Sequence, residues 1–171
     1  MLWQQYKNKT VARLAGLFPS LADKLVASYI PWGGDDIPWQ PVKKALAISK
    51  IALVTTAGVH HQGQTPFDMT DAQGDPTFRV LTRDSIIDDH TITHDYYDHR
   101  DADKDLNIVF PLERLLEMNR AGVIGAIAER HYSFMGHIDG HHIYDLMQNQ
   151  APGVAEMLLV DDVDAVLLTP G

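Results

Sequence analysis

Three stretches of the chain are largely apolar without alternation, and this pattern predicts strands that are buried on both faces. The clearest runs from Lys50 to Thr56, where Ile, Ala, Leu and Val follow one another with no polar residue between them. Residues 123–128 and 164–168 have a similar character. Alternating polar and apolar positions would indicate a sheet with one solvent-exposed face, whereas continuous apolar runs are typical of a parallel sheet whose two faces are both covered.

Helical spacing separates these predicted strands. Three leucines between residues 112 and 116 share one helix face. Pro111 suits the first turn of that helix, and Gly122 suits the position just after its end. Two further helical segments are expected over residues 142–150 and 153–160, separated by a proline. The order of strand, loop, helix, strand, helix and strand predicts an α/β fold with a mostly parallel sheet flanked by helices.

The segment between the first two predicted strands is harder to interpret. From Val59 to about Asp89 there is no convincing periodicity, and several glycines and prolines interrupt the stretch. A segment of this length without regular structure is usually functional or mobile. Residues 91–93 are expected to form a short strand.

The first 30 residues have apolar positions three to four apart, which predicts amphipathic helices. Because this segment also carries basic side chains, the helices could bind one of three surfaces. These are the chain's own domain, which is the simplest interpretation, a membrane surface, or another protein. Residues 31–42 are rich in Pro and Gly and are interpreted as a linker. We therefore expect a helical extension with its linker over residues 1–42, and an α/β domain, incomplete at its C-terminus, over residues 43–171.

Composition narrows the class of protein. Of the 171 residues, 45% are hydrophobic and 22% charged, which is typical of one soluble globular domain. The net charge of −9 argues against a nucleic-acid surface. No apolar run approaches the ~20 residues of a membrane span, and there is no secretion signal, so a cytoplasmic protein is expected. The absence of cysteine excludes disulfides and thiol nucleophiles within these residues.

Reactive side chains gather in two segments, His94 to Asp103 and His131 to Ile138. Four histidines follow predicted strands, namely His60, His94, His131 and His137. The carboxyl ends of parallel strands meet at one edge of a sheet, where α/β proteins bind their ligands. These histidines are therefore expected to face one common edge.

Several motifs in this part of the chain are distinctive. They are Asp-Tyr-Tyr-Asp at 95–98, Gly-Val-Ile-Gly at 122–125, Val-Asp-Ala-Val-Leu-Leu-Thr-Pro at 163–170 and, most specifically, His-Tyr-Ser-Phe-Met-Gly at 131–136. With these motifs the chain resembles the glycine/sarcosine/betaine reductase and D-proline reductase family, specifically its selenoprotein B type subunits. The resemblance covers roughly residues 50–171.

The resemblance implies reductive cleavage of an α-carbon–nitrogen bond in an amino acid or related amine, with a dithiol as electron donor. In the family, the redox residue is a selenocysteine, or a cysteine in some relatives, directly after a strand like residues 163–170. A chain truncated just before that residue is therefore expected, with the selenocysteine or cysteine following Gly171. Implied partners are other reductase subunits, a thioredoxin-like donor and, for a D-proline type enzyme, a subunit carrying a pyruvoyl group.

Candidate roles follow from the resemblance and from side-chain chemistry. His131, His137 and His94 are candidates for catalysis, since a histidine can donate a proton to a departing amine near neutral pH. Candidates for substrate binding are Asp95, Asp98, Arg100, Ser133, Gly136, His60 and Thr169. Each has a structural alternative: the histidines can bond to backbone carbonyls, and Arg100 can form a surface ion pair with a neighbouring aspartate instead of clamping a carboxylate.

Two other functions stay open. The His and Asp clusters could serve a metal-dependent hydrolase, although no His-x-x-x-His spacing supports it and no metal site is expected. Alternatively, the chain could be a non-catalytic interaction subunit that uses its basic N-terminal helices. Because nothing in the sequence covers the last strand, a homo-oligomer that buries it is expected.

Overall fold

The computed structural model describes residues 40–84 and 89–171, together with single positions between residues 7 and 27. The predicted N-terminal helices and most of the linker therefore lie outside the described residues, and the boundary between residues 42 and 43 stays a prediction. Within the described part, no helix is both long and apolar enough to cross a lipid bilayer.

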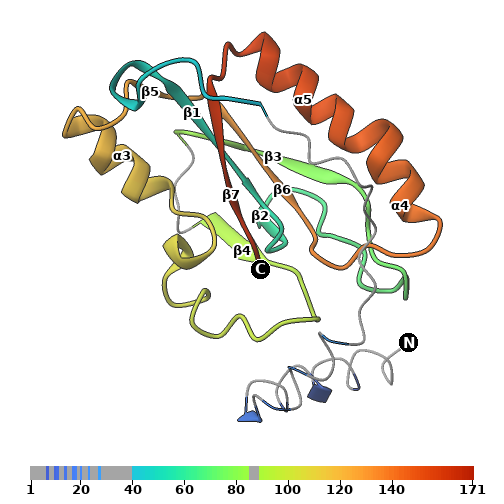
Figure 1. Cartoon of the computed structure of the whole chain (residues 1–171). Helices are drawn as coiled ribbons and strands as arrows, with labels where there is room; N and C mark the ends of the chain where they lie inside the picture. Colours follow the sequence, from blue (N-terminus) through green and yellow to red (C-terminus); the bar gives the residue numbers. More distant parts are fainter. Residues whose placement is uncertain are drawn as a thin grey trace.

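The sheet is built around β1 (Lys50–Thr55), as its continuous apolar run predicts. The other strands of this sheet are β3 (Phe78–Thr82), β5 (Ala126–Ile127), β6 (Arg130–Phe134) and β7 (Ala165–Thr169). β5 pairs with the first half of β1 and β6 with its second half, both in parallel, and β7 runs parallel to β1 along its length. β3 is antiparallel to β6. The prediction of an α/β fold with a mostly parallel sheet is confirmed (Figure 1).

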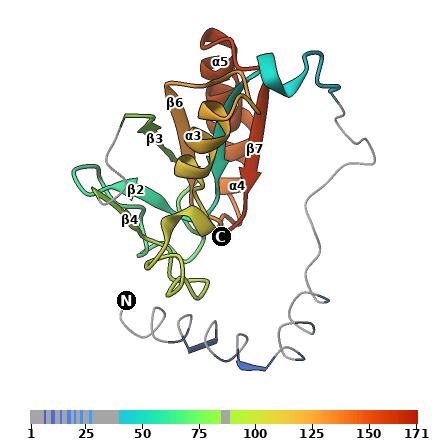
Figure 2. The same ribbon diagram turned by 90° about the vertical axis from the view of Figure 1, so that its left-hand side faces the viewer.

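The hydrogen bonds of β1 place β7 on one side of it and β5 on the other. The carbonyl of Lys50 accepts from Asp164 just before β7, whereas the carbonyl of Ile51 accepts from Ala128 just after β5. In a strand of a parallel sheet, the N–H and C=O of one residue both point to the same neighbouring strand, and those of the next residue point to the strand on the other side. The carbonyls of Lys50 and Ile51 therefore point to opposite sides of β1. Figure 2 accordingly shows β3 and β7 at opposite edges of the sheet.

A second, two-stranded sheet consists of β2 (Val59–His61) and β4 (His90–Ile92) in antiparallel pairing. The short strand expected near residue 91 therefore exists, shifted by one position. The expectation of no regular structure between residues 59 and 89 is wrong, because both β2 and β3 fall in that stretch. These strands are three and five residues long, too short for a period of two to stand out, and their pairing partners lie far along the chain.

The helix α3 (Leu112–Arg120) forms where its leucines predict it. Gly122 follows its end with a φ of 71°, the left-handed conformation that glycine adopts at no steric cost. Before β7 the chain forms α4 (His142–Asp145), a π-helical turn η4 (Leu146–Gln150) and α5 (Ala151–Val160) without interruption.

The predicted break at Pro152 in this second helical region is therefore wrong. Pro152 stands at the start of α5, directly after the π-helical turn. A proline inside a helix loses one backbone hydrogen bond, and its ring collides with the preceding turn. A wider π turn is a known local adjustment of an α-helix, so the two predicted helical pieces join into one.

The helices cover opposite faces of the sheet (Figures 1 and 2). On the α3 face, Leu53, Phe110 and Leu115 belong to a buried apolar cluster. On the α5 face, Tyr132, Phe134 and Val154 form the second cluster. Both faces of β1 are thus buried, as its uninterrupted apolar run requires.

Candidate functional site

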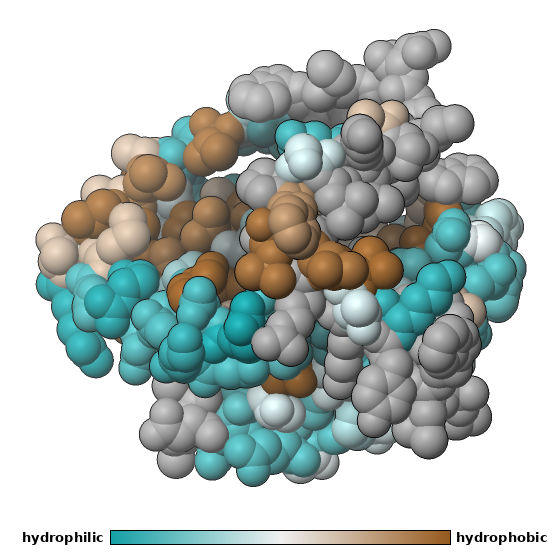
Figure 3. All heavy atoms as spheres, turned by 90° about the horizontal axis from the view of Figure 1, so that it is seen from below, coloured by the Kyte–Doolittle hydropathy of each residue, from teal (hydrophilic) through white to brown (hydrophobic). Residues whose placement is uncertain are grey.

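The functional candidates that come together lie beyond the carboxyl ends of the parallel strands. A hollow of about 240 Å³ is lined there by Thr56, His94, Tyr96, Tyr97, Gly136, His137 and Gly171. These residues follow β1, β4, β6 and β7, so four segments distant in sequence meet at one place. Figure 3 views the molecule from this end and shows hydrophobic atoms in a band bordered by hydrophilic ones.

His94 is fixed in one orientation by its neighbours. Its Nδ1 accepts a hydrogen bond of 3.1 Å from the backbone N–H of Tyr96. The ring of Tyr97 stands perpendicular to the imidazole, with ring centroids 4.8 Å apart. Because Nδ1 is the acceptor, the hydrogen of the neutral imidazole sits on Nε2.

Burial keeps this imidazole neutral. The residue is only 5% exposed, and this burial, followed by the nearby His137 and His99, lowers the pKa of His94 to about 4. Asp95 acts in the opposite direction, but less strongly. At neutral pH, His94 therefore offers an N–H and carries no charge.

We expect His94 to stay uncharged well below the pH at which an exposed histidine takes up a proton. Ring ¹⁵N shifts followed from pH 8 to pH 3.5 should show half-protonation near pH 4, against about 6.5 for an unfolded histidine. The cause is desolvation of the charged form, so the transition should move upward when the chain is denatured. A midpoint near 6.5 in the folded protein would contradict the burial described here.

Gly136 gives the hollow its access to His94. A Cβ at this position would lie 2.9 Å from Nε2 of His94 and 2.9 Å from the carbonyl oxygen of Thr56. Gly136 does not have a positive φ, so its backbone does not demand glycine. Glycine is required there because any side chain would collide with the imidazole of His94.

His137 is held from two sides. Its ring stacks on Tyr96 with centroids 3.9 Å apart and an interplanar angle of 17°. Its Nε2 lies 3.0 Å from the carbonyl oxygen of Ala72, and because a carbonyl only accepts, Nε2 is the donor. His137 thereby joins the segment after β6 to the loop before β3.

Among the predicted site residues, His94, His137 and Gly136 thus lie together. Thr169 ends β7 and donates from Oγ1 to the carbonyl of Val109 at 2.6 Å. It lies two residues before Gly171, whose backbone N–H donates to Thr56 at 3.3 Å.

His131 and Ser133 do not reach this site. His131 does follow the predicted strand, β5, but the expectation that it faces the common edge is wrong. It is the second residue of β6, and the side chains of His131 and Ser133 are fully buried inside the sheet. Nδ1 of His131 accepts from the backbone N–H of Leu53 at 3.0 Å. The ring thus replaces a backbone acceptor where β5 ends and β6 begins, and burial lowers its pKa to about 4.

Three other predicted binding residues also point elsewhere. His60 lies within β2, only 2% exposed, and its Nε2 is 2.8 Å from Oγ1 of Thr93. Arg100 forms the surface ion pair that was its alternative, with Nε 2.7 Å from Asp98. The guanidinium lowers the pKa of Asp98 to about 2.

Asp95 follows His94 directly and is half-buried, but it is not among the residues that line the hollow. Two residues next to it, Tyr96 and Tyr97, were interpreted from sequence as packing residues, yet both line the hollow. Tyr97 donates from its hydroxyl to the carbonyl of Ala57 at 3.2 Å, and burial raises its pKa. Their position in the sequence, two and three residues after His94, was the one feature that could have indicated that they line the site.

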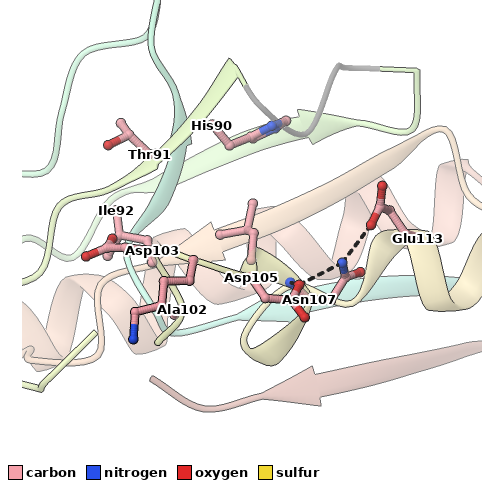
Figure 4. Close-up of a pocket in the computed structure, with 10 residues that line it drawn as sticks. His90, Thr91, Ile92, Ala102, Asp103, Asp105, Asn107 and Glu113 are labelled. Atoms are coloured by element: carbon pink, nitrogen blue, oxygen red, sulfur yellow. Dashed lines mark hydrogen bonds between the residues drawn. The ribbon is translucent and has the colours of Figure 1, made fainter. Parts of the chain in front are cut away.

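A larger hollow of about 430 Å³ lies between β4 and the segment before α3 (Figure 4). Its side chains include Asn107, whose amide donates to Asp105 at 3.0 Å and to Glu113 at 2.7 Å. None of the predicted site residues lines it. Across the described ranges, no three or more His, Asp or Glu side chains are grouped closely enough to hold a metal ion.

Comparison with known proteins identifies the family. The model of the glycine/sarcosine/betaine reductase selenoprotein B family matches residues 27–171, and the chain belongs to this family. It is 37% identical over 133 residues to D-proline reductase subunit gamma of Acetoanaerobium sticklandii, a match that covers 78% of this chain and 53% of that protein.

A second relative is sarcosine reductase complex component B subunit beta of Peptoclostridium acidaminophilum. It is 31% identical over 137 residues, which are 79% of this chain and 31% of that protein. The chain therefore spans about half the length of the first relative and about a third of the second. No solved structure matches with significance.

Proposed function

We propose that this chain forms the substrate-holding part of a reductase subunit that cleaves the α-carbon–nitrogen bond of an amino acid or related amine. The observation that carries this proposal is the meeting of His94, Gly136 and His137 beside Gly171, at the ligand edge of a parallel sheet. Family membership supplies the reaction class.

The redox residue is expected from the family resemblance to follow Gly171, which lines the hollow together with His94. The backbone N–H of Gly171 donates to Thr56, and His94 offers its neutral N–H to an anionic group of the substrate. A selenolate or thiolate there would supply the soft nucleophile of the reduction. His94 would hold an anionic group by hydrogen bonding, while its own low pKa makes it unsuited to carry the proton.

His137 is the better candidate to exchange a proton with the amine. It is partly exposed, and its ring is oriented by Ala72 and Tyr96. We further propose that other reductase subunits, a thioredoxin-like dithiol donor and, in a D-proline type enzyme, a pyruvoyl-bearing subunit complete the system.

The test is amine-dependent oxidation of a dithiol by the reductase complex that contains this chain. Glycine, sarcosine, betaine and D-proline are supplied one at a time, and at least one is expected to drive turnover. Residues 1–171 alone should show none, because they contain no thiol or selenol. Absence of turnover with all four amines in an assembled complex, or enzyme-like rates from residues 1–171 alone, would refute the proposal.

The alternatives are less well supported. A metal-dependent hydrolase needs a cluster of ligands, and the described part of the chain offers no such group. A purely structural subunit would not need Gly136 to leave His94 accessible. Deletion of residues 1–30 tests the role of the N-terminal segment, since loss of assembly without loss of amine binding would assign it to subunit contact.

We also propose that β7 is covered in a homo-oligomer. It is the edge strand beyond β1, and Leu168 on it is 71% exposed. Replacing Leu168 by lysine should shift the mass measured by light scattering toward the monomer, because charge on an edge strand opposes edge-to-edge pairing. Tyr144→Lys is the control, since Tyr144 is 72% exposed and belongs to α4 rather than to a strand of the sheet. A monomeric wild-type chain at high concentration would refute the proposal.

A further inference from the structure

His94 and His137 line the same hollow, and their hydrogen-bond partners leave a different ring nitrogen available on each. Both carry their hydrogen on Nε2: that of His94 because Nδ1 accepts from Tyr96, and that of His137 because Nε2 donates to Ala72. In His94 it is this Nε2–H that lies next to Gly136. In His137 the corresponding N–H is already used by the loop.

The free nitrogen of the neutral His137 ring is therefore Nδ1, which carries a lone pair. The edge formed by Nε2 and Cδ2 faces the loop before β3, since a Cβ at Gly74 would lie 3.4 Å from Cδ2. Nδ1 lies on the other edge of the ring. Since the Nε2 edge is taken by the loop and His137 lines the hollow, we infer that Nδ1 is the nitrogen available to a ligand there. The hollow would then combine one imidazole that offers a hydrogen with one that can accept a hydrogen.

No side chain that lines this hollow in the described structure belongs to Lys, Arg, Asp or Glu. A molecule with equal positive and negative charge suits such a lining better than a net ion, since an unpaired ion loses solvation without a counter-charge. Quaternary ammonium groups are usually recognised by open aromatic faces. Here one face of Tyr96 is covered by His137, and Tyr97 packs against His94.

We propose, resting on the proposed function, that the hollow selects α-amino acids that keep at least one N–H on the nitrogen. The carboxylate accepts from Nε2 of His94, and the ammonium N–H donates to Nδ1 of His137. Glycine, sarcosine and proline satisfy both partners. Betaine, which has three methyl groups on nitrogen and no N–H, leaves Nδ1 of His137 buried against a methyl group.

The experiment uses the 171-residue chain labelled with ¹⁵N in its histidine rings. In the free protein, both rings should show the Nε2–H tautomer. Added sarcosine should shift Nε2 of His94 and Nδ1 of His137, and titration should give an affinity at least tenfold higher than that of betaine. Acetate, which has only the carboxylate, should shift His94 alone.

A variant separates recognition from packing. His137→Phe keeps an aromatic ring on Tyr96 but removes both the acceptor and the Nε2–H bonded to Ala72. The preference for sarcosine over betaine should fall toward one, while an unchanged shift of Nε2 of His94 with acetate would show that the hollow itself is intact. His61→Phe is the matched control, because His61 lies in β2 and does not line the hollow; its preference should equal that of the wild type. An undiminished preference in His137→Phe overturns the inference.

Two further outcomes distinguish this inference from the proposed function. Equal binding of betaine and sarcosine overturns the inference alone, because the chain would still bind the amines of the reductase reaction. Failure of glycine, sarcosine, D-proline and betaine to shift either ring overturns the inference, and turnover in the assembled complex then decides the proposed function separately. A hydrogen on Nδ1 of either ring also overturns the inference.

Discussion

Replacing His131 by leucine is expected to destabilise the fold by about 1 kcal/mol at pH 7.5. The substitution leaves one buried backbone N–H unpaired, but it also removes the Nε2–H of His131, which is buried without a hydrogen-bond partner in the described structure. The group left unpaired is the backbone N–H of Leu53 in the middle of β1, which donates to Nδ1 of His131. Urea unfolding measures the loss. His131→Asn should lose less, because its side-chain oxygen is an acceptor near the position of Nδ1.

The same substitution should change how stability depends on pH. The pKa of His131 is about 4 in the folded chain and 6.5 in the reference state, so below pH 6.5 the unfolded state binds more protons. The wild-type chain therefore loses folding free energy as pH falls from about 6.5 to about 4, because its His131 stays uncharged while that of the unfolded chain takes up a proton. This loss reaches roughly 3 kcal/mol and then stays constant. His94, whose pKa is also lowered to about 4, makes the folded chain less stable over the same pH range.

Stability of the wild type should consequently fall more steeply between pH 6.5 and pH 4 than that of His131→Leu, which retains only the contribution of His94. Urea midpoints at pH 7.5, 6, 5 and 4 give both curves. The control is His61→Leu, whose ring is 42% exposed and lies outside the sheet of β1. Parallel curves for wild type and His131→Leu would mean that His131 does not stay neutral in the folded chain.

His131 also illustrates what the sequence alone could and could not establish. The continuous apolar run of β1 and the leucine spacing of α3 predicted both elements, since long runs of one period leave little choice. The motif around residues 131–136 indicated the family, which the match of the family model over residues 27–171 confirms. It did not show that His131 replaces a backbone acceptor, because this requires the interruption between β5 and β6, and no local pattern encodes that interruption.

The site itself was predictable in part. Parallel strands bring their carboxyl ends together, and on that basis four histidines were expected at one edge: His60, His94, His131 and His137. Of these, His137 follows β6 of the parallel sheet and lines the hollow, whereas His94 reaches it from β4 of the two-stranded antiparallel sheet, to which the rule does not apply. The sequence could not show whether the guanidinium of Arg100 would bind a ligand or pair with Asp98, because residue spacing is compatible with both. Tyr96 and Tyr97 were assigned to packing because aromatic side chains usually serve that purpose, yet they both pack and line the hollow.

The second large effect is expected from one added methyl group. Gly136→Ala should reduce amine binding by residues 1–171, and amine-dependent turnover in the assembled complex, by at least tenfold. The new Cβ would stand 2.9 Å from Nε2 of His94, closer than ordinary contact allows, and 2.9 Å from the carbonyl oxygen of Thr56. The imidazole must therefore turn away, or its N–H is covered; either change removes the donor on which the proposed binding depends.

Gly153→Ala is the matched control. A Cβ there meets nothing within 4 Å, and the position lies inside α5, where alanine is favoured over glycine by about 0.5–1 kcal/mol. It should bind amines as the wild type does and unfold at slightly higher urea. The φ of Gly136 is not in the left-handed region, but the contact of 2.9 Å with the backbone carbonyl of Thr56 should cost the Gly136→Ala chain some stability. Far-UV circular dichroism and urea unfolding therefore check that the variant is folded in the binding assay, and ring ¹⁵N shifts should report a displaced His94. Wild-type binding by a folded Gly136→Ala chain would show that substrates do not approach Nε2 of His94, and the site would have to be sought elsewhere at this end of the sheet.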